Sequence, residues 1–215
     1  SRNDCSSALF WLCFYWFCSC PPTPPICQQT QVRPKDENVK VGIHLVQIGD
    51  NDGSPSGNDR KVQQMLLEHQ TKAILVEANP QVFQGLLKTV ADTYKNSPRI
   101  RPMNALVCPK GANLVFYMVS DKLKADFPKA PHWVTQQLSS LEMESVRRGV
   151  QGFLRRRGKA SDYIEAKTVE CTSFAEVLEK GGFSPKDVDV LAVDVEGHDA
   201  KVVTEAMKVP QFMPG

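Results

Sequence analysis

The chain has little net charge, no long apolar run and no internal repeat. Across 215 residues, 26 Lys and Arg against 24 Asp and Glu give a formal net charge of +2. That charge is too small for bulk attraction to nucleic acid or to a membrane surface, and we expect no nucleic-acid partner. The most apolar stretch covers only residues 8–18, whereas a helix that crosses a membrane needs about 20 apolar residues.

The sequence also lacks the cysteine spacing of a metal or redox site. Of its seven cysteines, five fall within the first 27 residues, and no two are spaced as C-x-x-C. Cys108 and Cys171 stand apart from the others and from each other. We interpret both as small buried residues rather than reactive thiols, and we expect no metal site.

Residues 1–38 differ in composition from the rest of the chain. The apolar run at residues 8–18 is rich in aromatics, and a proline-rich stretch that cannot extend a helix follows at residues 21–25. The run fits the apolar part of a secretory signal or an anchor, or else the segment is not native coding sequence. We therefore place it outside the fold and assign residues 39–215 to one domain, which we expect to be cytoplasmic. If the segment is genuine, a secretory or membrane-anchored location follows instead, and only then a membrane contact.

From residue 41 onward, short apolar strands alternate with amphipathic helices. Strands are predicted at residues 41–48, 73–77, 99–107, 114–119, 166–171 and 188–195. Helix starts are marked by Asn58 or Asp59, by Asn79 before Pro80, by the capping-box spacings Ser139 to Glu142 and Ser173 to Glu176, and by Asp199. The alternation predicts an α/β fold with a doubly wound, mainly parallel sheet. Residues 121–160 are the least regular, and we expect a variable insert there.

The first strand breaks into a loop that begins at Gly49 and ends at Gly53. Between the glycines stand Asp50, Asn51 and Asp52. Glycine adopts positive φ and lets a ligand reach bare backbone, although an ordinary turn between a strand and a helix has the same composition. The loop is neither G-x-G-x-x-G nor a P-loop. Its two acids would repel a pyrophosphate and favour a cationic or amine-bearing ligand.

Other strands also end in polar groups, and the carboxyl ends of parallel strands meet at one edge of a sheet. Glu77 ends the second strand, Asn104 interrupts the third, and Asp194 and Glu196 end the last. We therefore predict a cleft at that edge, with Glu77 placed to accept hydrogen bonds from a ribose diol. Asp194 and Glu196 share a strand face. They are candidates for an acid/base pair, a cation site, or anchors for an amine and a hydroxyl, and His198 is a candidate base.

Each of these features has a structural alternative. Glu77 also suits the start of a helix, and capping of the last helix accounts for Glu196 or Asp199 nearly as well as a site does. A basic cluster at the end of the insert is a candidate patch for an acidic substrate or nucleic acid: Arg147, Arg148, Arg155, Arg156, Arg157 and Lys159. We favour a solvated helix face there, with cations near the helix C-terminus.

Four motifs stand in the order and spacing of FkbM-like methyltransferases, which are class I enzymes that use S-adenosyl-L-methionine. They are residues 46–53 (VQIGDNDG), 76–80 (VEANP), 104–107 (NALV) and 193–199 (VDVEGHD). The last motif is the most specific, and the resemblance covers roughly residues 39–210. It implies a Rossmann-like fold, with helices on both faces of a mainly parallel sheet.

The resemblance also implies which residues hold S-adenosylmethionine. The implied set is Gln47, Gly49, Asp50, Asn51, Asp52, Gly53, Glu77, Ala78, Asn104, Ala105 and Asp194. Residues 49–53 would hold the methionine part, Glu77 the ribose, and residues 104–105 would lie near the adenine. Asp194 would lie near the amine or the reacting methyl. The methyl would pass to a hydroxyl oxygen of a small molecule or glycan, chiefly by proximity, with Glu196 or His198 as an optional base.

Two features depart from the family's pattern. Gln47 stands where many class I methyltransferases have an acid, although its amide oxygen can still accept from a ligand amine. The chain also ends where the family continues, so we expect the C-terminal strands of the sheet to be missing. The alternatives to an enzyme are a non-catalytic domain that keeps the fold for binding or stability, and, more distantly, an NAD-linked enzyme.

Overall fold

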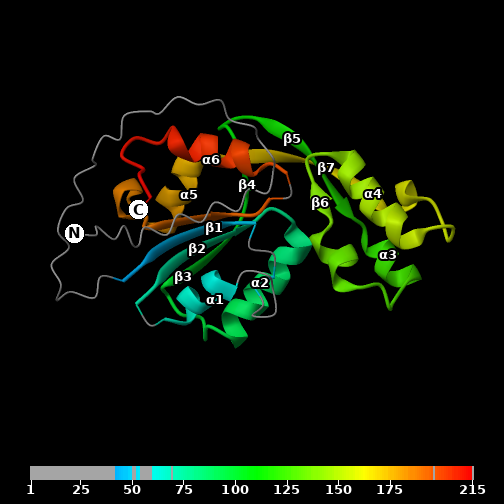
Figure 1. The fold of residues 1–215 in the computed structure, drawn as a ribbon, viewed down its shortest axis with the longest axis horizontal. Coiled ribbons are helices and arrows are strands. Elements are labelled where there is room, and N and C mark those ends of the chain that lie inside the picture. The colour runs from blue at the N-terminus through cyan, green and yellow to red at the C-terminus, as the bar shows by residue number, and fades with distance from the viewer. Residues whose placement is uncertain (1–41, 50–51, 54–59, 69, 196, 215) are drawn as a thin grey trace, which may run out of the picture. The chain divides into compact units, whose positions relative to one another are not determined.

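The structure, a computed structural model, describes residues 42–49, 52–53, 60–68, 70–195 and 197–214 (Figure 1). The chain divides into two units, Ser1–Val39 and Lys40–Gly215, and every described residue belongs to the second. Some predictions therefore lie outside the described residues. They are those for residues 1–38, for a helix start at Asn58 or Asp59, and for Asp50, Asn51 and Glu196 in the site.

A four-stranded parallel sheet forms the centre of the fold, in the order β3-β2-β1-β8. Its strands are β1 (His44–Ile48), β2 (Lys72–Glu77), β3 (Ile100–Asn104) and β8 (Val190–Val193). In the register of the sheet, Ile48 pairs with Val76 on one side and Val193 on the other. The carboxyl ends of these three strands therefore lie at the same edge, as predicted.

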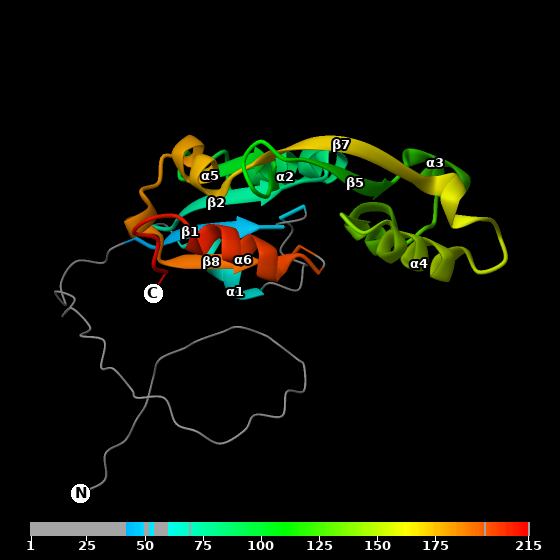
Figure 2. The ribbon, with the colours of Figure 1, turned by 90° about the horizontal axis from the view of Figure 1, so that it is seen from above.

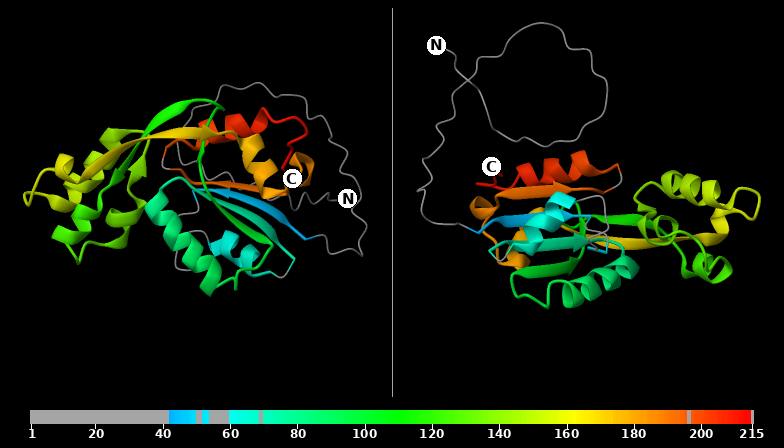
Figure 3. Two further views of the ribbon diagram at one scale, coloured as in Figure 1. Left: turned by 180° about the vertical axis from the view of Figure 1, so that it is seen from behind. Right: turned by 60° about the horizontal axis from the view of Figure 1, so that its bottom comes forward.

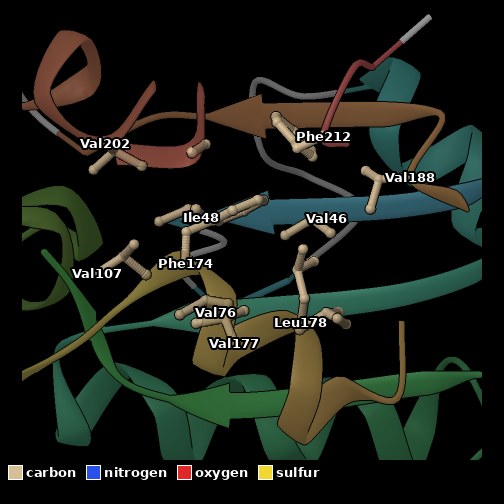
Figure 4. Close-up of a cluster of buried hydrophobic side chains, with 12 residues drawn as sticks. Val46, Ile48, Val76, Val107, Phe174, Val177, Leu178, Val188, Val202 and Phe212 are labelled. Carbon is tan, nitrogen blue, oxygen red and sulfur yellow. The ribbon is translucent and has the colours of Figure 1, made fainter. Parts of the chain in front are cut away.

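Helices cover both faces of this sheet (Figure 3). They are α1 (Arg60–Leu67) and α2 (Pro80–Asp92) on one face, and α5 (Phe174–Gly181) and α6 (Asp199–Met207) on the other. Leu45 packs with α1 and α2, whereas its neighbour Val46 packs with α5 and α6 (Figure 4). Burial on both faces explains why the strands are apolar at nearly every position. The predicted Rossmann-like, doubly wound sheet is confirmed.

Two helices that pack on the parallel sheet, α2 and α5, begin directly after the predicted capping residues. Asn79 precedes α2 and its side chain accepts a hydrogen bond from Gln81 N at 3.0 Å. Ser173 and Glu176 form a full capping box at the start of α5, which ends at Gly182 with φ of 69°.

A second, mostly antiparallel sheet has the order β4-β7-β5-β6. Its strands are β4 (Leu106–Val107), β5 (Asn113–Val119), β6 (Ser139–Ser140) and β7 (Ile164–Thr172). The predicted strand at residues 99–107 is thus split. Ala105 N donates to Glu77 O at the end of β2, and β4 then pairs with β7 instead.

Residues 113–172, which we name the arm, contain the predicted insert. The strands β5 and β7 run from the parallel sheet out to a group of short helices (Figure 2). These are α3 (Asp121–Asp126), a π-helical turn (Trp133–Gln137), α4 (Met143–Leu154) and a 3-10 turn (Ala160–Tyr163). A separate apolar cluster holds them together, with Leu123, Val134, Val146, Val150 and Leu154 at its centre.

Two predictions about the arm and its base are wrong. Ser139 does not open a capping box, because residues 139–140 form β6 and α4 starts at Met143 without a side-chain cap. Cys108 and Cys171 are buried as predicted but are not separate thiols, since they form a disulfide. The pairing of β4 with β7 sets Leu106 opposite Cys171 and so brings the two cysteines together. Among the described residues, no helix combines the length and apolarity that crossing a membrane requires.

Candidate functional site

A cavity of about 1290 Å³ lies at the carboxyl ends of β1, β2 and β8 and extends to the arm. This is the edge at which open α/β sheets bind ligands. Among the described residues, all but one of those predicted for the site line it: Gln47, Gly49, Asp52, Gly53, Glu77, Ala78, Ala105, Asp194 and His198. The exception is Asn104. The described residues contain no cluster of His, Cys, Asp or Glu suited to a metal ion.

At Gly49, the backbone that follows β1 packs closely against the backbone that follows β8. Its φ is +83°, and its N–H donates to Val76 O at 2.8 Å. A Cβ at this position would lie 1.9 Å from Asp194 O, far inside van der Waals contact. Gly53 also has a positive φ, of +63°. The glycines predicted from the sequence therefore serve a close approach of two backbones as well as a turn.

Glu77 ends β2 and lines the cavity. It is 8% exposed, and its Oε1 accepts a hydrogen bond from Asn79 N at 2.6 Å. The predicted helix-start role and the predicted site role are thus compatible. Asn104 Nδ2 donates to Glu77 O at 2.7 Å and Ala105 N donates to the same oxygen at 3.2 Å. Asn104 therefore fixes the end of β2 rather than lining the cavity.

The loop after β8 differs from the sequence-based prediction. Because β8 ends at Val193, Asp194 lies beyond the strand, and the expected shared strand face with Glu196 does not apply to it. Asp194 N donates to Ile48 O at 2.9 Å, which ties the loop to β1. Asp199, at the start of α6, accepts from Val195 N at 3.0 Å. Asp199 thus has a structural contact, but not the predicted capping role, because it is the first residue of α6 and the helix starts after His198 without a side-chain cap.

His198 lies directly before α6 and borders the cavity, with only 9% of its surface exposed. Burial lowers the pKa of its imidazole below the ordinary 6.5, and the charge of Lys201 lowers it further, against smaller opposing effects of Glu142 and Asp199. A lowered pKa leaves the imidazole neutral at pH 7. His198 is therefore in the form that accepts a proton.

The arm supplies the wall that faces these strand ends, and sequence reasoning missed its residues. They are chiefly Tyr117, His132, Trp133, Ser139 and Ser140. His132 Nε2 lies 3.2 Å from Asp52 Oδ2, so the arm contacts the loop that follows β1. No spacing in the sequence marks these residues, because the long-range pairing of β5 with β7 is what carries them to the cavity.

A parallel sheet with a glycine turn and acids at its strand ends defines the class of α/β domains that bind a ligand at a sheet edge. A family model described as the methyltransferase FkbM domain matches residues 47–212. The chain belongs to the FkbM methyltransferase domain family, and the resemblance found in the sequence is confirmed. Methyltransferases of this family generally use S-adenosylmethionine. Searches of curated proteins and of solved structures gave no match.

Proposed function

We propose that this chain is an S-adenosylmethionine-dependent methyltransferase that methylates a hydroxyl oxygen of a small molecule or glycan. The observation that carries the proposal is one cavity bordered by Gly49, by the buried carboxylate of Glu77, and by a wall from the arm. Its volume of about 1290 Å³ exceeds the roughly 300–1,000 Å³ of ordinary ligand pockets. Such a volume accommodates a cofactor and an acceptor together.

The residues at the strand ends fit this cofactor. Glu77 is suited to the two ribose hydroxyls, because a carboxylate only accepts hydrogen bonds. Gly49 and Gly53 border the cavity and carry no side chain that would obstruct the methionine part. Asp52 and Asp194 bring negative charge to the amine and the sulfonium, and Ala78 and Ala105 offer small apolar surface to the adenine. When bound, S-adenosylmethionine supplies an electrophilic methyl group on a positively charged sulfur.

Proximity and orientation would do most of the catalysis, because an acceptor held in line gains a large effective concentration. His198 adds a base. Its buried imidazole, neutral at pH 7 through its lowered pKa, is suited to receive the proton that leaves the acceptor hydroxyl. Lys201, on the first turn of α6, keeps positive charge near that imidazole and so favours its neutral form.

Calorimetric titration of S-adenosylhomocysteine into the full chain tests the proposal, with Glu77→Gln beside the wild type. We expect micromolar binding by the wild type and about tenfold weaker binding by the variant, since a hydrogen bond to a charged group is lost. Glu179→Gln is the matched control. Glu179 is exposed on α5 away from the cavity, so this variant should bind like the wild type.

No binding by a folded wild-type chain would overturn the proposal, as would equal affinities for all three proteins. Tight binding without methyl transfer to any of a panel of hydroxylated acceptors would favour the non-catalytic binding module. A preference for NAD over S-adenosylhomocysteine would favour the NAD-linked enzyme.

A further inference from the structure

The arginines of the basic cluster at the end of α4 have different surroundings. Arg147 is paired with Glu144 through two hydrogen bonds, the longer of which measures 2.6 Å from Nε to Oε2. Arg148 and Arg156 are exposed and line neither the large cavity nor the second one that follows. Arg155 and Arg157 instead line a second cavity, of about 410 Å³. The solvated helix face favoured from the sequence thus describes only part of the cluster.

Arg157 is held in one place at the rim of this second cavity. Its guanidinium carbon lies 5.2 Å from the ring centre of Phe127 and 4.9 Å from that of Phe153. Its Nη2 donates to Phe153 O at 2.7 Å and its Nε donates to Leu154 O at 3.3 Å. A guanidinium fixed by two rings and two carbonyls presents its charge without further ordering on binding.

Arg155 has a backbone conformation that favours glycine, with φ of +55°. The side-chain amide of Gln151 holds this turn through hydrogen bonds of both its nitrogen and its oxygen. Its Nε2 donates to Arg155 O at 2.8 Å and to Gly158 O at 3.3 Å, and its Oε1 accepts from Ala160 N at 3.1 Å. A non-glycine residue kept at positive φ by its surroundings is a strained feature, and such features cluster at ligand sites.

Trp133 lines both this cavity and the large one, so the two cavities are neighbours. It is 46% exposed, so its indole has surface that a ligand can cover. The contact of the preceding residue, His132, with Asp52 ties the π-helical turn to the loop after β1. Arg155 and Arg157 therefore lie beside a residue that also forms the wall of the large cavity.

We propose that the cavity formed by Trp133, Phe153, Arg155 and Arg157 is a subsite for an anionic group, a phosphate, sulfate or carboxylate, carried beside a ring. An indole provides a flat face for the ring, and guanidinium groups bind such anions through paired hydrogen bonds. The assignment of this anion to the methyl acceptor rests on the proposed function, whereas anion binding at the subsite does not.

The test is calorimetric titration of phenyl phosphate into the full chain, with benzyl alcohol as the neutral comparison. Phenyl sulfate, benzoate and inorganic phosphate distinguish the kind of anion and the need for the ring. We expect phenyl phosphate to bind about tenfold more weakly to Arg155→Ala. Arg156→Ala removes the same charge from the adjacent position outside the cavity and should leave the affinity unchanged.

Arg155→Gly guards against misfolding, because glycine accepts the positive φ at this position, and it should lose phenyl phosphate binding as Arg155→Ala does. Both variants should keep the wild-type affinity for S-adenosylhomocysteine. Equal losses of phenyl phosphate affinity in the Arg155 and Arg156 variants would mean general surface attraction and would overturn the subsite. So would no binding by the folded wild type. Phenyl phosphate binding without S-adenosylhomocysteine binding would keep the subsite and overturn the proposed function.

Discussion

The parallel sheet and the arm form opposite walls of one cavity in different ways. The sheet contributes backbone conformation, with Gly49 at positive φ packed against Asp194 O and with strand ends held in register. The arm contributes side chains, such as Trp133 on the π-helical turn, carried beside a small apolar cluster. The sheet therefore fixes the shape of the cavity through its backbone, whereas on the arm side the side chains that face a ligand can vary.

This contrast predicts different consequences of substitution. A change at the sheet edge alters a backbone contact that the core depends on, so stability and cofactor binding should fall together. A change on the arm alters a side chain at the rim of a separate cluster, so acceptor binding should fall while the fold persists. The following substitutions test the contrast, from the largest expected effect to the smallest.

Gly49→Ala should give the largest loss. Its Cβ would lie 1.9 Å from Asp194 O, and the position has φ of +83°. Because the obstructing atom is backbone and not the end of a flexible side chain, we expect unfolding in urea to show a loss of at least about 3 kcal/mol. Binding of S-adenosylhomocysteine should be lost with it.

Gly152→Ala is the matched change on the arm. Gly152 lies inside α4, and a Cβ there would meet no atom within 4 Å. Alanine is the better helix former, so this variant should gain up to about 1 kcal/mol in the same measurement. Comparable losses for both glycines would refute the division between a sheet fixed by backbone contacts and a more tolerant arm.

The disulfide between Cys108 and Cys171 joins the two regions and should give the next largest effect. It links the end of β4, at the wall of the large cavity, to β7 at the base of the arm, across a sequence separation of 63. Replacing both cysteines by alanine should cost about 2–4 kcal/mol of stability in thermal or urea unfolding. Cofactor binding should weaken as well, because residues 105–109 line the cavity.

Reduction of the wild type should reproduce this loss, and the double variant should not respond to reductant. That control is needed because five further cysteines lie in residues 1–27. A wild-type midpoint that does not change in reductant would show that the bond does not hold the arm to the sheet.

The same contrast explains how much of the fold and of the candidate site could be predicted from the sequence. Strands buried on both faces leave a continuous apolar signal, and their carboxyl ends meet by necessity, so Gly49, Glu77 and Asp194 could be assigned to one cleft. The helix starts at Asn79 and Ser173 were predictable because their side chains bond to backbone three residues away or fewer. Local chemistry is enough for all of these.

The arm depends on contacts between distant residues, which leave no periodic signal. Ser139 has the spacing of a capping box, yet pairing of Met118 with Ser139 makes that position part of β6. The disulfide follows from the pairing of β4 with β7 and could not be deduced from two isolated cysteines. The roles of His132 and Trp133 likewise depend on where the arm ends up, and so they were missed.

Ser173→Ala and Ser120→Ala compare helix starts in the two regions and should give the smallest effects. In the capping box of α5, Ser173 Oγ bonds to Glu176 N at 3.3 Å and to Glu176 Oε2 at 2.9 Å. Its loss should cost about 1 kcal/mol in urea unfolding. Ser120 precedes α3 without a side-chain cap, and its buried hydroxyl has no hydrogen-bond partner among the described residues. Its replacement by alanine should be neutral or slightly stabilising.

The cost of Ser173→Ala should also depend on pH, which separates the capping box from packing. The hydrogen bond from Lys110 and the bonds from Ser173 lower the pKa of Glu176 from its ordinary 4.5 to about 2. A carboxylate with a lowered pKa stabilises the fold above its unfolded pKa and loses that effect as the pH falls through the folded one. Ser173→Ala removes only the hydroxyl's bond to this carboxylate, while the bonds from Lys110 and from Ser173 N remain. The difference between wild type and variant should therefore be full at pH 7 and shrink in part between pH 4.5 and about 2. A difference that stays constant over this range would assign the effect to packing or to the bond between Ser173 Oγ and Glu176 N, which does not titrate. Ser120→Ala should show no such slope.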